Sequence, residues 1–239
     1  MKERVTRLVC PSVAVLVVAL AATGIASATA ITYVGSSGNL SAQAAFSLTG
    51  NTLTVTLTNT STADVMVPTD VLTGVFFNLT TGLTPVSASD PGSTVYYGTL
   101  SNVGDGWGFA TGVSANGKNS AISATGAVNG LGHSNFSLNH QNLDGLAYGL
   151  LSAGDDPGTG NTGVKGHGPL IKDTAQFVLT APQGFDLSEL GNTVVFQYGT
   201  SLDETHYDGH QTTPEPATLA MLGSGVIGLA GVLRRKYQL

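Results

Sequence analysis

Hydrophobic and polar residues alternate most clearly in the segments 44–48 and 52–58. In the second segment threonines occupy every other position, with aliphatic residues between them. A period of two over this length predicts half-buried β-strands. The intervening Gly50-Asn51 pair is typical of a two-residue hairpin turn, and it sets a register with Phe46 opposite Val55. The same register brings four more apolar residues onto one face as the pairs Leu48 with Leu53 and Ala44 with Leu57.

Further short strands are predicted along the chain, each bounded by Gly, Pro, Asn or Asp. They cover the ranges 74–79, 83–88, 94–100, 106–113, 120–125, 174–180 and 193–198. One helical turn is expected at 186–191, with Asp186 as its cap, Glu189 at the capping-box position and Gly191 at its end. Short strands at this spacing predict an all-β fold, a single antiparallel β-sandwich with glycine-rich loops, over residues 31–200.

An apolar run without strand periodicity lies near the N-terminus. Lys2, Arg4 and Arg7 precede the apolar stretch 8–22, and small residues follow it. This pattern predicts a secretory signal peptide over residues 1–30, which signal peptidase would remove. The A-x-A pattern offers two cleavage sites, after Ala28 and after Ala30. An uncleaved membrane anchor is the alternative. A lipoprotein signal is disfavoured because Cys10 opens the apolar stretch instead of following it.

A second apolar run lies in residues 214–239. Its uncharged part, 217–233, would form a helix of about 26 Å at about 1.5 Å per residue, which is enough for a thin hydrocarbon core. The preceding prolines cannot continue a helix backwards. Three basic residues follow the run and would stay cytoplasmic, so the rest of the chain would lie outside. They are Arg234, Arg235 and Lys236.

The order of these features resembles the PEP-CTERM sorting signal of Gram-negative bacteria. The triplet Pro214, Glu215 and Pro216 precedes the apolar run and the basic cluster, and the resemblance covers residues 213 to about 236. It implies recognition by exosortase, a membrane-embedded cysteine transpeptidase that is thought to cut near the triplet. The body would then pass to another anchor or to the outside. A plain C-terminal membrane anchor is the alternative, and in both cases the segment is not itself catalytic.

Three segments of the body also resemble a subgroup of exosortase-dependent surface proteins. They are residues 143–149, residues 169–171 and the Phe-Gln-Tyr-Gly-Thr-Ser-Leu segment from Phe196 to Leu202. That subgroup is defined by its sorting and not by a known activity, so the resemblance implies a surface location without a mechanism.

Charge and cysteine content narrow the function of the body. Between residues 31 and 213 there are three lysines, no arginine and thirteen acidic residues, which gives 3 − 13 = −10. Such a surface repels phosphate backbones, so nucleic-acid binding is disfavoured. The single cysteine, Cys10, lies in the predicted signal peptide, which leaves the body without disulfides or thiolate chemistry. Residues 201–213 are polar and are predicted to form a tether to the membrane segment.

Two groups of residues are weak candidates for a metal site. Asp155 and Asp156 lie in a glycine-rich loop and could bind Ca²⁺, but they lack the spacing of a dedicated calcium loop, and a solvated turn is the simpler interpretation. His206, Asp208 and His210 would share one face of an extended strand, as in a two-histidine, one-carboxylate site. Their place in the predicted tether argues against a fixed geometry.

Trp107 is the only tryptophan, and an exposed one could stack on a sugar ring; a buried core aromatic is the alternative. No G-x-S-x-G, H-E-x-x-H or recognisable pair of catalytic carboxylates appears, and no cofactor is predicted. The first hypothesis is therefore a non-enzymatic, exported surface or matrix protein, often linked to exopolysaccharide by the resemblance. A secreted glycan-binding module and a secreted hydrolase are the alternatives.

Overall fold

The computed structural model describes residues 29–98, 102–126, 128, 133–137, 143, 145–166 and 168–212. Across these ranges the protein is all-β, as predicted, and its helical elements are short 3₁₀ turns. They are η1 (Pro68–Asp70), η2 (Val103–Asp105) and η4 (Leu187–Leu190). No helix in the described ranges is long and apolar enough to cross a membrane. The predicted helix at 217–233 lies outside them.

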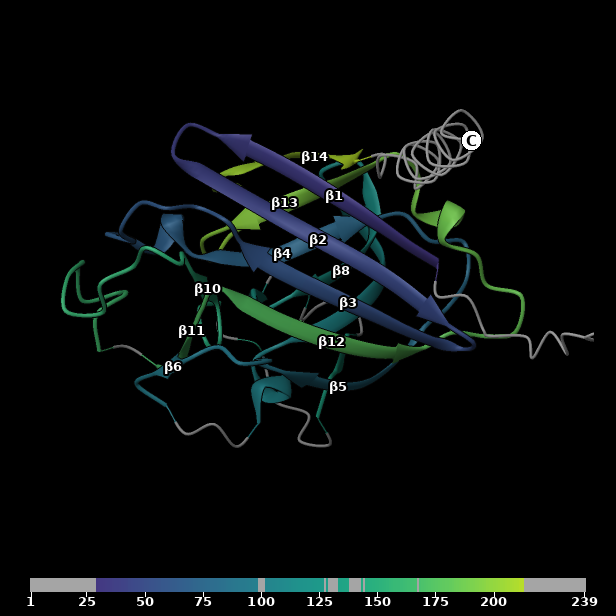
Figure 1. The fold of residues 1–239 in the computed structure, drawn as a ribbon, viewed down its shortest axis with the longest axis horizontal. Helices are drawn as coiled ribbons and strands as arrows, with labels where there is room; N and C mark the ends of the chain where they lie inside the picture. Colours follow the sequence, from purple (N-terminus) through teal and green to yellow (C-terminus); the bar gives the residue numbers. More distant parts are fainter. Residues whose placement is uncertain are drawn as a thin grey trace, which may run out of the picture.

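One continuous sheet contains the strands (Figure 1). Hydrogen bonds join them in the order β5-β12-β3-β2-β1-β14-β13-β4-β10-β11-β6, and β4 also pairs with β8, which leads to β7 and then β9. The pairs are antiparallel except β10 with β11. The bounds are β1 Thr29–Ser37, β2 Leu40–Thr49, β3 Thr52–Asn59, β4 Leu72–Phe77, β5 Thr84–Ser89, β6 Val95–Tyr96, β7 Gly108–Ala115, β8 Lys118–Ser123, β9 Ser134–Asn135, β10 Leu150–Leu151, β11 Leu170–Lys172, β12 Thr174–Thr180, β13 Thr193–Tyr198 and β14 His206–Thr212.

The β2–β3 hairpin has the register that the alternation predicts. Phe46 lies opposite Val55, and the pairs Leu48 with Leu53 and Ala44 with Leu57 follow from it. Val55 is fully buried, whereas the threonines on either side of it are half-buried on the outer face. Gly50 has φ 59°, the left-handed conformation that the turn requires. The predicted register of the hairpin is therefore confirmed, and so is the prediction that its aliphatic residues face the core.

The two layers of the sandwich are parts of the same hydrogen-bonded sheet. In Figure 1 strands β1, β2, β3 and β12 lie in front of β4 and β8. Aromatic rings join the layers: Phe46 of β2 meets Phe77 of β4 edge-on at 5.3 Å, and Phe177 of β12 packs against Trp107 at 4.9 Å between centroids. The core therefore lies inside a sheet that curls over itself.

Strand β14 makes this continuity possible, and it lies where a tether was predicted. It pairs with β1, with Thr212 opposite Thr32, and on its other side with β13, with His210 opposite Thr193. The prediction of a polar tether at 201–213 is therefore wrong for residues 206–212. Residues 201–205 form the turn from β13 into β14.

The inward side of β14 carries no aliphatic residue, which explains why alternation did not reveal it. Tyr207 packs against Phe196 and Tyr198, and its hydroxyl lies 2.9 Å from that of Tyr198. At Gly209 an added Cβ would lie 2.4 Å from Cε2 of Phe196, so the ring occupies the place of a side chain. Tyrosine and glycine thus take the positions that leucine or valine fill in β3.

The other strand predictions differ from the structure at their ends. β12 and β13 have the predicted bounds. Within 94–98, the described part of the strand expected at 94–100, only β6 forms, and the sequence did not indicate β1. At η4, Asp186 accepts a hydrogen bond from the Ser188 amide at 2.7 Å, and Gly191 has φ 72°. Glu189 does not close a capping box; it accepts hydrogen bonds from Thr80 and Thr81 of another loop.

Candidate functional site

The predicted sorting signal begins where the sheet ends. Thr212 is the last residue of β14, and its hydroxyl donates to the carbonyl of Thr32 in β1 at 3.1 Å. The predicted signal residues Pro214, Glu215, Pro216, Arg234, Arg235 and Lys236 lie outside the described residues. Only Thr213 separates the paired strand from the triplet. Any partner that acts on the triplet therefore meets a site two to four residues from the folded sheet.

The first residues of β1, which are next to the predicted signal peptidase sites in the sequence, lie at the same end of the sheet. Ala28 is outside the described residues, whereas Thr29 and Ala30 belong to β1, opposite Leu48 and Ser47. Cleavage after Ala28 would leave β1 whole, but cleavage after Ala30 would remove two paired residues. The site after Ala28 is thus the one that the fold favours. We call this end of the sheet, with Thr29 and Thr212, the signal end.

Trp107 cannot serve as an exposed platform for sugars. Its side chain is fully buried, and its Nε1 donates to the carbonyl of Tyr148 at 3.0 Å. Its ring packs on Phe177, which also meets Phe136 at 5.1 Å. The glycan-platform hypothesis for Trp107 is therefore wrong, and the alternative of a buried core aromatic is confirmed, because the indole joins the two layers of the core.

The residues His206, Asp208 and His210 share the exposed face of β14, as an extended strand requires. They do not form a metal site: in the part of the chain that the structure describes, no group of three or more His, Cys, Asp or Glu side chains could hold a metal ion. His206 instead bonds through Nδ1 to the carbonyl of Glu204 at 2.9 Å. The face remains polar and solvated.

Asp155 and Asp156 differ sharply in environment. Asp156 is exposed, and its carboxylate accepts from the Gly158 amide in its own turn. Asp155 is only 5% exposed. Its Oδ1 accepts from the Val65 amide at 3.1 Å, and its Oδ2 has no hydrogen-bond partner among the described residues. Burial raises the pKa of Asp155 to about 6, and the Asp64 carboxyl beside it adds to that rise.

Asp64 is the residue that sequence reasoning missed at this site. Its Oδ1 accepts from the Asp156 amide at 2.9 Å, and its Oδ2 accepts from the Thr159 hydroxyl at 2.6 Å. The Thr159 hydrogen bond and that amide hold the pKa of Asp64 below its usual range. Nothing local marks Asp64, which lies 91 residues before Asp155 and stands alone among uncharged neighbours.

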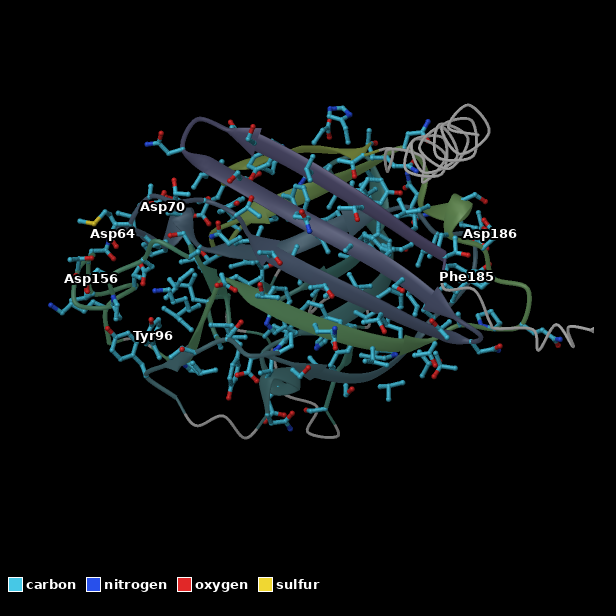
Figure 2. The ribbon with its side chains drawn as sticks, in the orientation of Figure 1. Asp64, Asp70, Tyr96, Asp156, Phe185 and Asp186 are labelled. Atoms are coloured by element: carbon cyan, nitrogen blue, oxygen red, sulfur yellow. The ribbon has the colours of Figure 1, made fainter. Side chains whose placement is uncertain are left out.

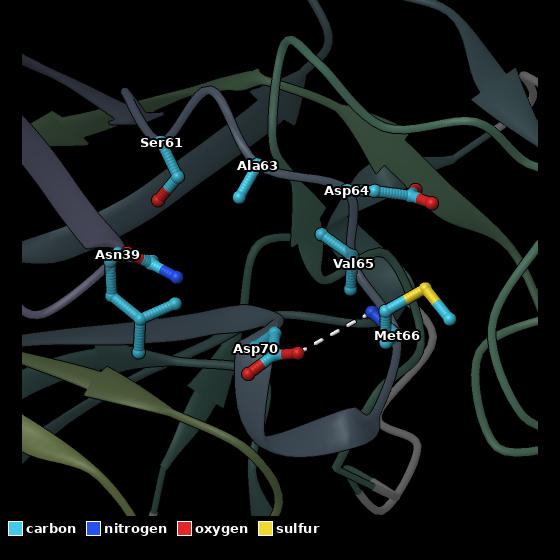
Figure 3. A pocket seen from close by; sticks show the side chains of 8 residues that line it. Asn39, Ser61, Ala63, Asp64, Val65, Met66 and Asp70 are labelled. Carbon is cyan, nitrogen blue, oxygen red and sulfur yellow. Dashed lines mark hydrogen bonds between the residues drawn. The ribbon is translucent and has the colours of Figure 1, made fainter.

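These acids lie at the end of the molecule opposite the signal end. Figure 2 shows Asp64, Asp70 and Asp156 at one end, and Phe185 and Asp186 at the other. Beside Asp64 an open pocket of about 340 Å³ is lined by Asn39, Ser61, Ala63, Val65, Met66 and Asp70 (Figure 3). Asp70 accepts from the Met66 amide at 3.3 Å. We call this the distal end.

The geometry thus defines an all-β body whose chain ends lie on neighbouring strands, with an acidic loop pair at the opposite end. Residues 212–236 match the family model described as the PEP-CTERM protein-sorting motif. This match confirms the resemblance seen in the sequence and supports an exosortase-sorted, exported protein that is anchored in a membrane before cleavage. Comparison with curated proteins gave no match, and comparison with solved structures gave none. The resemblance of Phe196–Leu202 to a subgroup is not addressed by the match and stays a prediction.

Proposed function

We propose that this protein is a non-enzymatic, structural or adhesive component of the bacterial surface or extracellular matrix, associated with exopolysaccharide and delivered by exosortase. The observation that carries the proposal is the sorting motif at residues 212–236, which follows directly on a paired strand. A cut near Pro214 to Pro216 would remove the predicted membrane segment and leave every strand of the sheet in the product. The product of sorting is then the whole folded body.

The fold supports this role in a second way. β14 lies between β1 and β13, so the sheet cannot be completed until residue 212 has been exported. Signal peptidase and exosortase would act on neighbouring strands at the signal end, which faces the membrane in the precursor. The distal end then faces outward. A body charge of about −10 favours partners that are neutral or cationic over anionic phosphates and lipid headgroups.

The sorting step is tested by replacing Pro214, Glu215 and Pro216 together with alanine. The run 217–233 and the basic cluster are untouched, so membrane insertion and orientation should not change. In a host with exosortase we expect an unprocessed form to accumulate in the inner membrane. It should be heavier by about 2.5 kDa, since about 25 of the 239 residues of a 24.2 kDa chain stay attached.

The matched control removes the charges of Arg234, Arg235 and Lys236 and leaves the triplet intact. This variant should weaken the membrane stop and let precursor pass into the periplasm. If the triple-alanine variant matures to the wild-type mass and location, the segment is a plain anchor and the sorting proposal fails. The link to exopolysaccharide is tested separately, by co-sedimentation of the mature protein with polymer isolated from the producing cells.

A further inference from the structure

The distal end holds two loops that are tied together by their acidic residues. One loop, residues 60–67, follows β3, and the other, residues 152–160, follows β10. Each carboxylate binds the amide that follows the other acid: Asp155 accepts from Val65, and Asp64 accepts from Asp156. Two further contacts join the loops, from the Ser152 hydroxyl to the carbonyl of Ala63 and from the Thr159 hydroxyl to the Asp64 carboxylate at 2.6 Å. Directly after the second loop, the Asn161 amide donates to the carbonyl of Met66 at 2.9 Å.

This reciprocal arrangement leaves one polar atom unexplained. Oδ2 of Asp155 has no donor on a side chain that is 95% buried, and the carboxyl groups of Asp155 and Asp64 lie within reach of one shared proton or cation. Lys172 donates to the Asp155 backbone carbonyl at 3.4 Å and not to the carboxylate. A buried carboxylate oxygen without a donor is costly unless a cation or a proton meets it.

We propose that Asp64 and Asp155 together bind one Ca²⁺ ion, which ties the loop 60–67 to the loop 152–160 at the distal end. Both acids keep the backbone amides that position them, so their oxygens are held in place without the ion. Asp64 is partly exposed, which leaves room for water to complete the coordination shell. Ca²⁺ accepts carboxylates from irregular loops together with water, whereas Mg²⁺ demands a near-ideal octahedron.

The small number of protein ligands predicts weak binding of Ca²⁺. Two carboxylates supply at most four of the six to eight oxygens that Ca²⁺ takes, so the affinity should be that of extracellular modules, on the order of 10⁻⁴ to 10⁻³ M. The inference concerns the distal loops alone, and its outcome does not depend on whether exosortase cuts the chain. Asp156, which the sequence suggested as a ligand, faces its own turn and is not part of this site.

The test uses the full-length protein in detergent, freed of metal with a chelator that is then removed. Thermal unfolding is followed by the fluorescence of Trp107, the only tryptophan, while CaCl₂ is raised from about 10 µM to 10 mM. At 10 mM CaCl₂, a tenfold to hundredfold excess over Kd, we expect Tm to rise by about 3–10 °C, and less with MgCl₂. Asp155→Asn and Asp64→Asn should lose this rise.

Asp203→Asn is the matched control, because it removes an exposed carboxylate outside the cluster and should keep the full shift. Equilibrium dialysis with radioactive calcium gives a second readout that does not depend on stability. It should find one ion per chain in the wild type and in Asp203→Asn, and none in Asp155→Asn that is shown to be folded by near-UV circular dichroism.

Three results would overturn the proposal. The first is an absence of calcium binding. If Asp155→Asn is then more stable than the wild type at pH 7, the two acids share a proton instead of an ion. The second is a shift that Asp155→Asn retains, which would reflect general screening of the acidic surface. The third is an equal shift with MgCl₂, which would show that the loops do not select the larger cation.

Discussion

The β2–β3 hairpin and strand β14 lie in the same sheet, yet only the hairpin is visible in the sequence. β3 alternates threonine with leucine and valine, and each aliphatic residue is fully buried. β14 alternates as well, but its inward positions hold Tyr207 and Gly209, and its outward positions hold histidine and aspartate. A strand whose inner face is shaped by its neighbours carries little periodic signal of its own.

The difference also lies in how each segment is stabilised. The hairpin has a local turn and a local register, so its two strands need no third partner to define their pairing. β14 packs between β1, which is 180 residues away at the Thr32–Thr212 contact, and β13. Its hydrogen bonds exist only once both neighbours are in place. A local sequence pattern therefore predicts the hairpin and does not predict β14.

The largest effect should come from Val55→Asp in the hairpin. The carboxylate would enter a fully buried position with no partner, and we expect a loss of about 4 kcal/mol or more in unfolding free energy. Urea unfolding followed by Trp107 fluorescence measures it. Thr54→Asp, on the outer face of the same strand, should cost less than about 1 kcal/mol. Equal losses in the two variants would contradict the burial of Val55 on the inner face of the hairpin and the position of Thr54 on its outer face.

Gly209→Ala tests β14 in the same way. The new methyl group would meet the Phe196 ring, and overpacking of this kind costs about 1–3 kcal/mol. Gly82→Ala is the control, because its Cβ would have open space and its backbone is not in the left-handed region. A neutral Gly209→Ala in the same unfolding measurement would mean that β14 does not pack against Phe196 and that the predicted tether was correct.

The smallest effect should come from Tyr207→Phe. It removes the hydrogen bond to the Tyr198 hydroxyl and keeps the ring, so the expected loss is about 1 kcal/mol. Burial raises the pKa of Tyr207, and it raises that of Tyr198 to about 12, so both stay neutral at physiological pH. A double-mutant cycle with Tyr198→Phe isolates the pair. A coupling energy of zero would show that the two hydroxyls do not meet.

Sequence reasoning found some parts of the candidate sites and missed others, because a local pattern does not show contacts between distant segments. The sorting signal could be identified because its triplet, apolar run and basic cluster are contiguous, and the family match confirms it. Asp155 was suspected from its glycine-rich loop, but its partner Asp64 was not, since the contact joins two loops far apart in the chain. The ring of Trp107 could stack on a sugar if it were exposed, but the side chain is fully buried. Its exposure depends on tertiary packing, which the sequence pattern does not show.

The sequence alone determined the all-β class, the register of the hairpin, the strands β12 and β13, and the sorting signal. Each of these rests on residues that are neighbours in the chain or repeat with a fixed period. Only the tertiary structure decided that β14 closes the sheet beside β1, that Trp107 is core, and that Asp64 faces Asp155. Those outcomes depend on contacts between distant segments, whose free energy is gained only when the whole sheet has curled around its core.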